Sequence, residues 1–249
     1  MKKLLTIILL TVSVAAIRAE KMEIEELLTA EDIRLDSVPL GIIPGSGLCA
    51  VFGNSILTVD PTVESRRVDV AVGDTTVIDR FVSCGSFLAM KIHNSLVWTS
   101  ATRGFAGITF EDSDFGICTA SDSTVYVMRN SGAMELGLTD GRPKASYTFD
   151  ERPVTLQKLR DGIVTVTHRR VLSFYNGEWT LIHQHPCDIR CAAITPHGIF
   201  LGTDDGLWRC GPAGSVELLA NGSISSLFYD RTVLYILDGT AGLYRLSWL

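Results

Sequence analysis

A weak repeat that runs almost to the last residue constrains this sequence most. Residues 198–209 read Gly-Ile-Phe-Leu-Gly-Thr-Asp-Asp-Gly-Leu-Trp-Arg, two short apolar runs around a polar turn that contains glycine. Residues 232–245 repeat the arrangement, with Leu234 standing 35 residues after Ile199. A period of this size is typical of a repeat fold, in which each unit buries its apolar surface against its neighbours.

Strand–turn–strand units of the same kind recur from Gly47 onward. We align the units on one apolar position, which we assign to the second strand of each unit. This position is occupied by Ile56, Leu96, Val125, Ile163, Ile199 and Leu234, so successive units are 40, 29, 38, 36 and 35 residues apart. One four-stranded blade of a β-propeller takes about 40 residues. The sequence therefore predicts an all-β propeller of six blades. The short spacing of 29 leaves five blades open, seven also fit the class, and an open β-sandwich is the alternative fold.

The end of the chain indicates how such a ring closes. The last unit runs out at Leu249 after its third strand, residues 242–247, so its outer strand must come from elsewhere. We expect residues 31–38 to donate it, with Ile33 and Leu35 on one face, because this pairing would cover an exposed sheet edge. The predicted domains are therefore a signal peptide over 1–19, a charged lead-in over 20–30 and one propeller over 31–249.

The N-terminus has the pattern of a secretory signal peptide. Lys2 and Lys3 precede an apolar run over residues 4–17, and small residues follow, which favours cleavage after Ala16 or Ala19. The run is short for a membrane span of about 20 residues, although an uncleaved anchor remains an alternative. We expect a secreted or periplasmic protein without stable membrane insertion. The net charge of -6 gives no basic footprint, so we expect no nucleic-acid partner.

The fifth unit carries a family resemblance. Ile194 and Thr195, followed by residues 198–209, resemble the two-component-regulator propeller repeat. That repeat has, approximately, an isoleucine, then glycine-x-leucine-tryptophan-isoleucine-glycine-threonine, and then glycine-leucine. The match weakens in the sixth unit and is faint over residues 161–167, and Phe200 stands where the family has tryptophan. The resemblance implies WD40-like or YVTN-like architecture and an extracytoplasmic sensing or binding propeller without a signalling half. It transfers no catalytic residues.

The six cysteines of this chain favour buried thiols over a disulfide framework. Cys49 and Cys118 each lie seven residues before the aligned position of their unit, where other units have alanine or leucine. That slot predicts a small apolar position on the innermost strand, where free cysteine packs well. Cys187 and Cys191 could pair if their loop folds back, so one disulfide remains open.

Two segments carry residues that metals favour. His183, His185, Cys187 and Cys191 form a weak candidate for a zinc site. Their spacing matches no established zinc pattern, so we expect this segment to be a polar loop that connects two units. The acidic run over 111–114 lacks the spacing of a calcium loop, so we expect a solvated turn. We predict no cofactor.

Loops that join second to third strands should emerge together at one end of the ring. We expect them to form a charged rim, with cations from units two to four and carboxylates from units five and six. Its members, with an indole just beneath, would be Trp98, Arg103, Arg129, His168, Arg169, Arg170, Asp204, Asp205 and Asp238. Such a two-sided rim suits a polar ligand or a charged loop of a partner, although turns are polar in any protein.

These observations predict a function without fixing a ligand. The sequence has no hydrolase-elbow serine and no His-Glu-x-x-His helix. We therefore expect a secreted or periplasmic, monomeric, non-catalytic module that binds a protein or a glycan at the channel mouth. One alternative is a glycan hydrolase or lyase that uses Asp204, Asp205 and Asp238. Another is a structural subunit of an envelope assembly.

Overall fold

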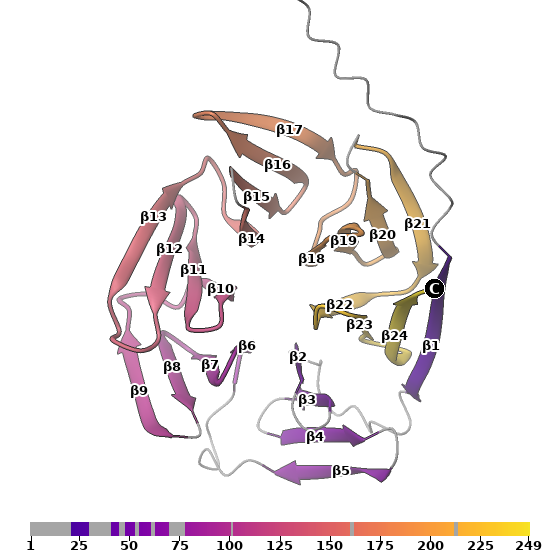
Figure 1. Cartoon of the computed structure of the whole chain (residues 1–249), viewed down its shortest axis with the longest axis horizontal. Coiled ribbons are helices and arrows are strands. Elements are labelled where there is room, and N and C mark those ends of the chain that lie inside the picture. Colours follow the sequence, from indigo (N-terminus) through magenta and orange to yellow (C-terminus); the bar gives the residue numbers. More distant parts are fainter. Residues whose placement is uncertain are drawn as a thin grey trace, which may run out of the picture.

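The repeat folds as predicted into a ring of β-sheets. The computed structural model describes residues 21–29, 41–44, 48–52, 55–60, 63–69, 78–100, 102–159, 162–211 and 214–249. It describes the side chains of all of these residues except those within 41–69. The described residues form 24 strands in six four-stranded sheets, which stand around a central axis (Figure 1). This arrangement confirms the β-propeller. No helix among the described residues is long and apolar enough to cross a membrane.

The sheets are named blades 1 to 6, each given from its innermost strand outward. Blade 1 contains β2 (Gly41–Pro44), β3 (Leu48–Phe52), β4 (Ser55–Asp60) and β5 (Val63–Asp69). Blade 2 contains β6 (Arg80–Cys84), β7 (Phe87–Ile92), β8 (Ser95–Ser100) and β9 (Arg103–Thr109). Blade 3 contains β10 (Gly116–Ser121), β11 (Thr124–Arg129), β12 (Gly132–Gly137) and β13 (Pro143–Thr148).

The second half of the ring follows the same order. Blade 4 contains β14 (Pro153–Leu159), β15 (Gly162–Thr167), β16 (Arg170–Tyr175) and β17 (Glu178–Gln184). Blade 5 contains β18 (Cys191–Thr195), β19 (Gly198–Gly202), β20 (Gly206–Cys210) and β21 (Val216–Asn221). Blade 6 contains β22 (Ile224–Tyr229), β23 (Leu234–Asp238), β24 (Gly242–Trp248) and, as its outer strand, β1 (Met22–Thr29).

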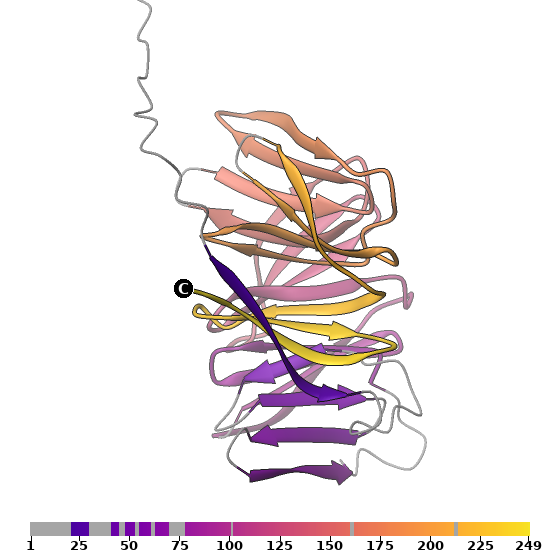
Figure 2. The same ribbon diagram turned by 90° about the vertical axis from the view of Figure 1, so that its right-hand side faces the viewer.

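An N-terminal strand closes the ring, as predicted, but a different segment provides it. β1 pairs antiparallel with β24, from Met22 opposite Trp248 to Thr29 opposite Gly242, and Figure 2 shows the two strands side by side near the C-terminus. Residues 22–29, which we assigned to the charged lead-in, therefore belong to the propeller, whereas the expected donor, 31–38, lies outside the described residues. An outer strand needs few apolar side chains, and charges protect its free edge, so a glutamate-rich segment can form it.

The repeat alignment was wrong in the first two blades. Ile56 and Leu96 lie in β4 and β8, which are third strands, whereas the four later alignment positions lie in second strands. The true second strands begin at residues 48, 87, 124, 162, 198 and 234, so successive blades are 36 to 39 residues apart. The short spacing of 29 thus came from comparing a third strand with a second. Cys49, in β3, is accordingly not equivalent to Cys118, in β10.

Packing between blades makes the core. The innermost strands contact one another in the closed order β2, β6, β10, β14, β18, β22 and back to β2. Buried clusters span neighbouring blades: Leu96 and Ile117 are fully buried in a cluster between blades 2 and 3, and Leu207 and Leu246 between blades 5 and 6. The amide of Ile224 also donates to the carbonyl of Thr203 across the latter interface, at 2.9 Å. The blades whose side chains the structure describes therefore bury their apolar surface against their neighbours.

The antiparallel order of each blade gives the ring two different ends. The linker face carries the turns between second and third strands, at 93–94, 130–131, 168–169, 203–205 and 239–241, together with the segments that join blades. The hairpin face carries the turns between first and second and between third and fourth strands, such as 122–123, 138–142 and 230–233.

Candidate functional site

The predicted rim is divided between the two ends of the ring. Its members on the linker face are Arg129, His168, Arg169, Arg170, Asp204, Asp205 and Asp238. Trp98 and Arg103 instead lie near the hairpin face, beside the turn from third to fourth strand of blade 2. The error follows from the misaligned blade 2, because a turn taken to follow the second strand in fact follows the third. The rim predicted around one mouth is therefore corrected to two separate groups.

Charges on the linker face mostly form local pairs. Arg169 Nε lies 2.7 Å from Asp188 Oδ1, and Arg190 Nη2 lies 2.7 Å from Asp204 Oδ2. Ion pairs of the same kind join Arg170 to Glu151 and Arg152 to Asp114. Two of these four pairs, Arg169 with Asp188 and Arg190 with Asp204, connect a segment that joins two blades with a neighbouring turn. Three of the charges predicted to contact a ligand, those of Arg169, Arg170 and Asp204, are thus neutralised by charged neighbours on the same face.

Three other predicted members of the linker-face group, Asp238, Asp205 and Arg129, also have structural partners. Asp238 is 4% exposed, and its Oδ1 accepts hydrogen bonds from Thr240 N and Oγ1, both at 2.8 Å. The Asp238 carboxylate therefore caps the turn that follows β23 in the last blade. Asp205 accepts from the thiol of Cys187 at 3.0 Å, and the Arg129 guanidinium lies 4.8 Å from the Phe110 ring centroid.

The cysteine and histidine cluster does not gather around one point. His183 Nε2 lies 3.3 Å from His185 Nδ1, and burial lowers the pKa of both imidazoles. Cys191 is buried and its thiol points toward the carbonyl of Ile224, 3.7 Å away, whereas Cys187 meets a carboxylate. Both thiols are free, as are those of Cys84, Cys118 and Cys210. Among the described residues no group of three or more such side chains could hold a metal ion.

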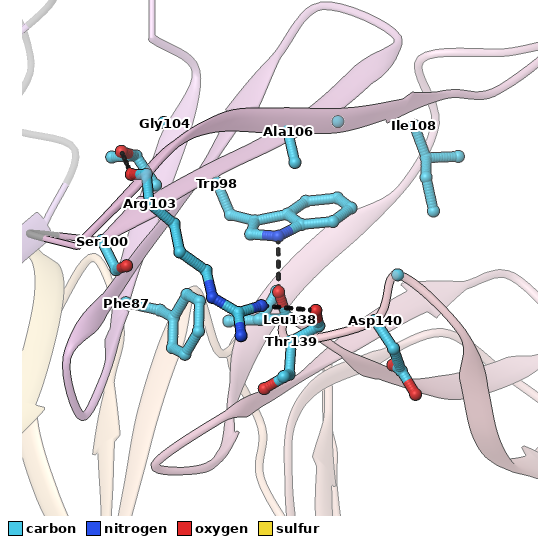
Figure 3. A pocket seen from close by; sticks show the side chains of 13 residues that line it. Phe87, Trp98, Ser100, Arg103, Gly104, Ala106, Ile108, Leu138, Thr139 and Asp140 are labelled. Atoms are coloured by element: carbon cyan, nitrogen blue, oxygen red, sulfur yellow. Dashed lines mark hydrogen bonds between the residues drawn. The ribbon is translucent and has the colours of Figure 1, made fainter.

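Trp98 and Arg103 line a pocket of about 350 Å³ on the hairpin face, between blades 2 and 3. Figure 3 shows the indole and the Phe87 ring on one side and the turn of blade 3 on the other. Trp98 Nε1 donates to the carbonyl of Leu138 at 2.7 Å, and Arg103 Nη1 donates to that of Thr139 at 2.7 Å. These two bonds fix the turn of blade 3 against blade 2.

Small residues keep this pocket open. β9 lines it with Gly104, Ala106 and Gly107, and the turn adds Gly141, where a Cβ would lie 3.6 Å from the indole. Ser100 adds a buried hydroxyl oxygen that has no hydrogen-bond partner among the described residues. The blade 2–3 pocket therefore combines an aromatic wall with a cation and an unused hydroxyl, but its lining contains no histidine or cysteine to activate a nucleophile.

The central channel forms a second cavity, of about 770 Å³, lined by the inner strands of blades 2 to 6. At the hairpin face Arg231 Nη2 lies 3.0 Å from Asp122 Oδ1. Because Asp122 belongs to blade 3 and Arg231 to blade 6, this ion pair spans the mouth between opposite blades. The predicted linker-face residues line neither of these two cavities. Only the structure could show that other residues line these cavities.

Comparisons with known proteins show the fold. No family model and no curated protein matches this sequence. Among solved structures, a catalytically inactive virginiamycin B lyase from Staphylococcus aureus with quinupristin is 10% identical, with a TM-score of 0.67 over 92% of this chain and 100% of that one. BamB from Moraxella catarrhalis is 11% identical, with a TM-score of 0.54 over 85% of this chain and 86% of that one.

The neighbours also include a protein of the type that the repeat resembles. The extracellular domain of a putative hybrid two-component system from B. thetaiotaomicron is 15% identical, with a TM-score of 0.54. The similarity covers 84% of this chain and 32% of that one, so this chain spans about a third of that neighbour. At these identities the likeness establishes a shared β-propeller fold, in agreement with the resemblance drawn from residues 194–209.

Proposed function

We propose that this protein is an extracytoplasmic, non-catalytic binding module that holds a segment of a partner protein against its hairpin face. The blade 2–3 pocket carries the proposal. Its aromatic wall, formed by Phe87 and Trp98, lies beside the Arg103 guanidinium and the Ser100 hydroxyl, which no other described residue engages. Apolar anchors that enter such pockets contribute much of the affinity at protein interfaces.

The dimensions of the pocket support a side chain as its occupant. A volume of about 350 Å³ is at the lower end of the range for ligand sites. The lip opposite Arg103 carries Asp140, whose pKa is lowered by its hydrogen bond to Lys144. A partner segment with one aromatic or aliphatic residue beside polar backbone groups matches this combination. A glycan could also use the polar lip, and glycan binding is an outcome of the experiment below.

The fold neighbours and the N-terminus support the remaining parts of the proposal. One neighbour is described as BBS1N in complex with ARL6DN, and another, PorZ, as an essential bacterial surface component of a secretion system. The signal-like residues 1–19 support secretion or a periplasmic location. We further propose a monomer. The hydrolase or lyase alternative has weaker support, because Asp238 is a turn cap and Asp205 accepts a thiol hydrogen bond.

Matched variants on the two faces test the proposal. Tagged mature protein would capture partners from its native envelope fraction, followed by titration of the purified partner. Ala106→Trp would fill the pocket and Arg103→Glu would reverse its cation, whereas Arg169→Glu makes the same reversal on the linker face. We expect about tenfold or greater loss of affinity for the two pocket variants, the size of one lost anchor contact, and unchanged binding for Arg169→Glu.

The same series identifies the result that would overturn the proposal. Equal affinity of all three folded variants and the unaltered protein would place the partner elsewhere. If only outer-strand changes disrupted association, the structural-subunit alternative would gain support. A thermal shift with glycans that Ala106→Trp abolishes would replace the protein partner by a carbohydrate, and glycan turnover abolished by Asp204→Asn would establish an enzyme.

A further inference from the structure

The central channel has the size of a small-molecule site. Its volume of about 770 Å³ lies within the range of ligand cavities. The ring of inner strands encloses it, and the ion pair between Asp122 and Arg231 crosses its mouth. Both side chains of that pair are more than two-thirds exposed, 75% and 82%, so the pair contributes little stability and can open at small cost.

The walls of the channel carry both polar and apolar side chains. Blades 2 and 3 contribute Ser83 and Thr119 beside apolar residues, and Figure 1 places their inner strands, β6 and β10, across the ring from β18 and β22. Blades 4 to 6 contribute the large apolar side chains of Leu159, Ile194 and Phe228. Leu159 is 46% exposed. An occupant with an apolar body would remove this surface from water, which is favourable in proportion to the buried area.

Arg80 places a cation in this cavity. It is the first residue of β6, lines the channel and is half-buried, yet its side chain has no hydrogen bond or ion pair among the described residues. Its charge acts on the thiols of Cys118 in blade 3 and Cys191 in blade 5, whose pKa values it lowers against the larger effect of burial. Blades 2 and 5 lie opposite each other, so this charge acts across the channel.

An unpaired cation that is partly withdrawn from water is costly, and an anionic ligand would compensate it. The other charged groups that line the cavity are Asp122, Asp230 and Arg231. The first and last of these form the pair at the mouth, and Asp230 Oδ1 accepts hydrogen bonds from the amides of its own turn. Arg80 is therefore the charged lining residue without a described partner.

We propose that the channel binds a small organic anion with an apolar body, an aryl or alkyl carboxylate or sulfonate, whose anionic group pairs with Arg80. The apolar body lies against Leu159, Ile194 and Phe228. This site is separate from the blade 2–3 pocket and does not depend on the partner assigned there, so the two proposals can fail independently.

Two probes that differ by one charged group test the site. 8-Anilinonaphthalene-1-sulfonate carries an anionic sulfonate, and N-phenyl-1-naphthylamine is the same skeleton without it. Fluorescence titration of the purified full chain should show saturable one-to-one binding of the sulfonate. Arg80→Gln should weaken this binding about tenfold or more, as expected for loss of one charge-assisted hydrogen bond, with a smaller loss for Arg80→Lys. Affinity for the neutral probe should not change.

Further variants keep the test decisive. Arg142→Gln removes an exposed cation that does not line the channel and should leave the sulfonate affinity unchanged. Gln157→Glu adds a carboxylate to the exposed channel wall and should weaken binding even if Arg80→Gln fails to fold. Absence of saturable sulfonate binding would overturn the proposal. Equal sulfonate affinity of folded Arg80→Gln and the unaltered protein, or equal loss with Arg142→Gln, would also overturn it.

Discussion

Gly202→Ala provides a sharp test of how the blades pack. Gly202 ends β19 and lies where blades 5 and 6 meet. A Cβ at this position would come within 2.4 Å of Cys191 Sγ and 2.7 Å of Ile224 Cγ2. Both neighbours are only 2% exposed, so neither can move into solvent. Ordinary contacts between such atoms are about 3.5–4.0 Å, and the interface must therefore open by roughly 1 Å.

The size of the penalty follows from this overlap. Overpacking a well-filled core by one methyl group costs about 1–3 kcal/mol, and the upper half of that range applies because two buried side chains must shift together. For a protein of this size each kcal/mol lowers Tm by about 2–4 °C. We therefore expect Gly202→Ala to lower Tm by roughly 4–12 °C.

Thermal unfolding followed by circular dichroism measures this effect, with Gly104→Ala as the matched control. Gly104 is exposed in β9, and a Cβ added there would have no heavy atom within 4 Å, so its substitution should be neutral or slightly stabilising. Cys191→Ala removes the nearest clashing atom, and in that background Gly202→Ala should cost about 1 kcal/mol less. Equal Tm values for Gly202→Ala and Gly104→Ala would refute the packing described here.

Two further predictions concern ionisable groups. Asp205→Asn should speed alkylation of Cys187 near pH 8, because the hydrogen bond to the Asp205 carboxylate raises the pKa of this thiol in the unaltered protein. Burial raises the pKa of Cys191 to about 12, so this thiol should stay unlabelled in the native protein. Mass-spectrometric peptide mapping measures both outcomes. Burial lowers the pKa of His183 and His185 below 6.5, so the unfolded chain binds more protons and stability should fall as pH drops below 6.5. The free energy of unfolding, measured by urea denaturation, should fall less steeply with decreasing pH in a variant with glutamine at both positions. An unchanged pH dependence in that variant would contradict this reasoning.

The period of the sequence was sufficient to predict the ring, because each blade repeats the same alternation of buried strands and polar turns. The register within a blade was harder to predict. Second and third strands both carry buried apolar residues, so Leu96 and Trp98 in β8 give the same pattern as Val125 and Val127 in β11. Apolar runs alone therefore could not distinguish one strand from the next, and this ambiguity moved Arg103 to the wrong end.

The closing strand shows a related limit. Residues 22–29 read Met-Glu-Ile-Glu-Glu-Leu-Leu-Thr, whose glutamates and leucines suit a helix as well as a strand. Only pairing with β24 decides the outcome, and the ion pair between Glu25 and Arg245 connects residues at opposite ends of the chain. Such long-range partners leave no local signal, which is why the need for a donor was predictable and its position was not.

The same reasoning separates the two faces by function. Segments that join blades must cross the linker face, so their charged side chains come within reach of the turns of the next blade. Arg169 with Asp188 and Arg190 with Asp204 are examples, and such pairs leave few charges for a ligand. Turns on the hairpin face join strands within one blade, and between them lie the blade 2–3 pocket and the channel mouth. Recognition at the hairpin face therefore costs the ring fewer of its own contacts.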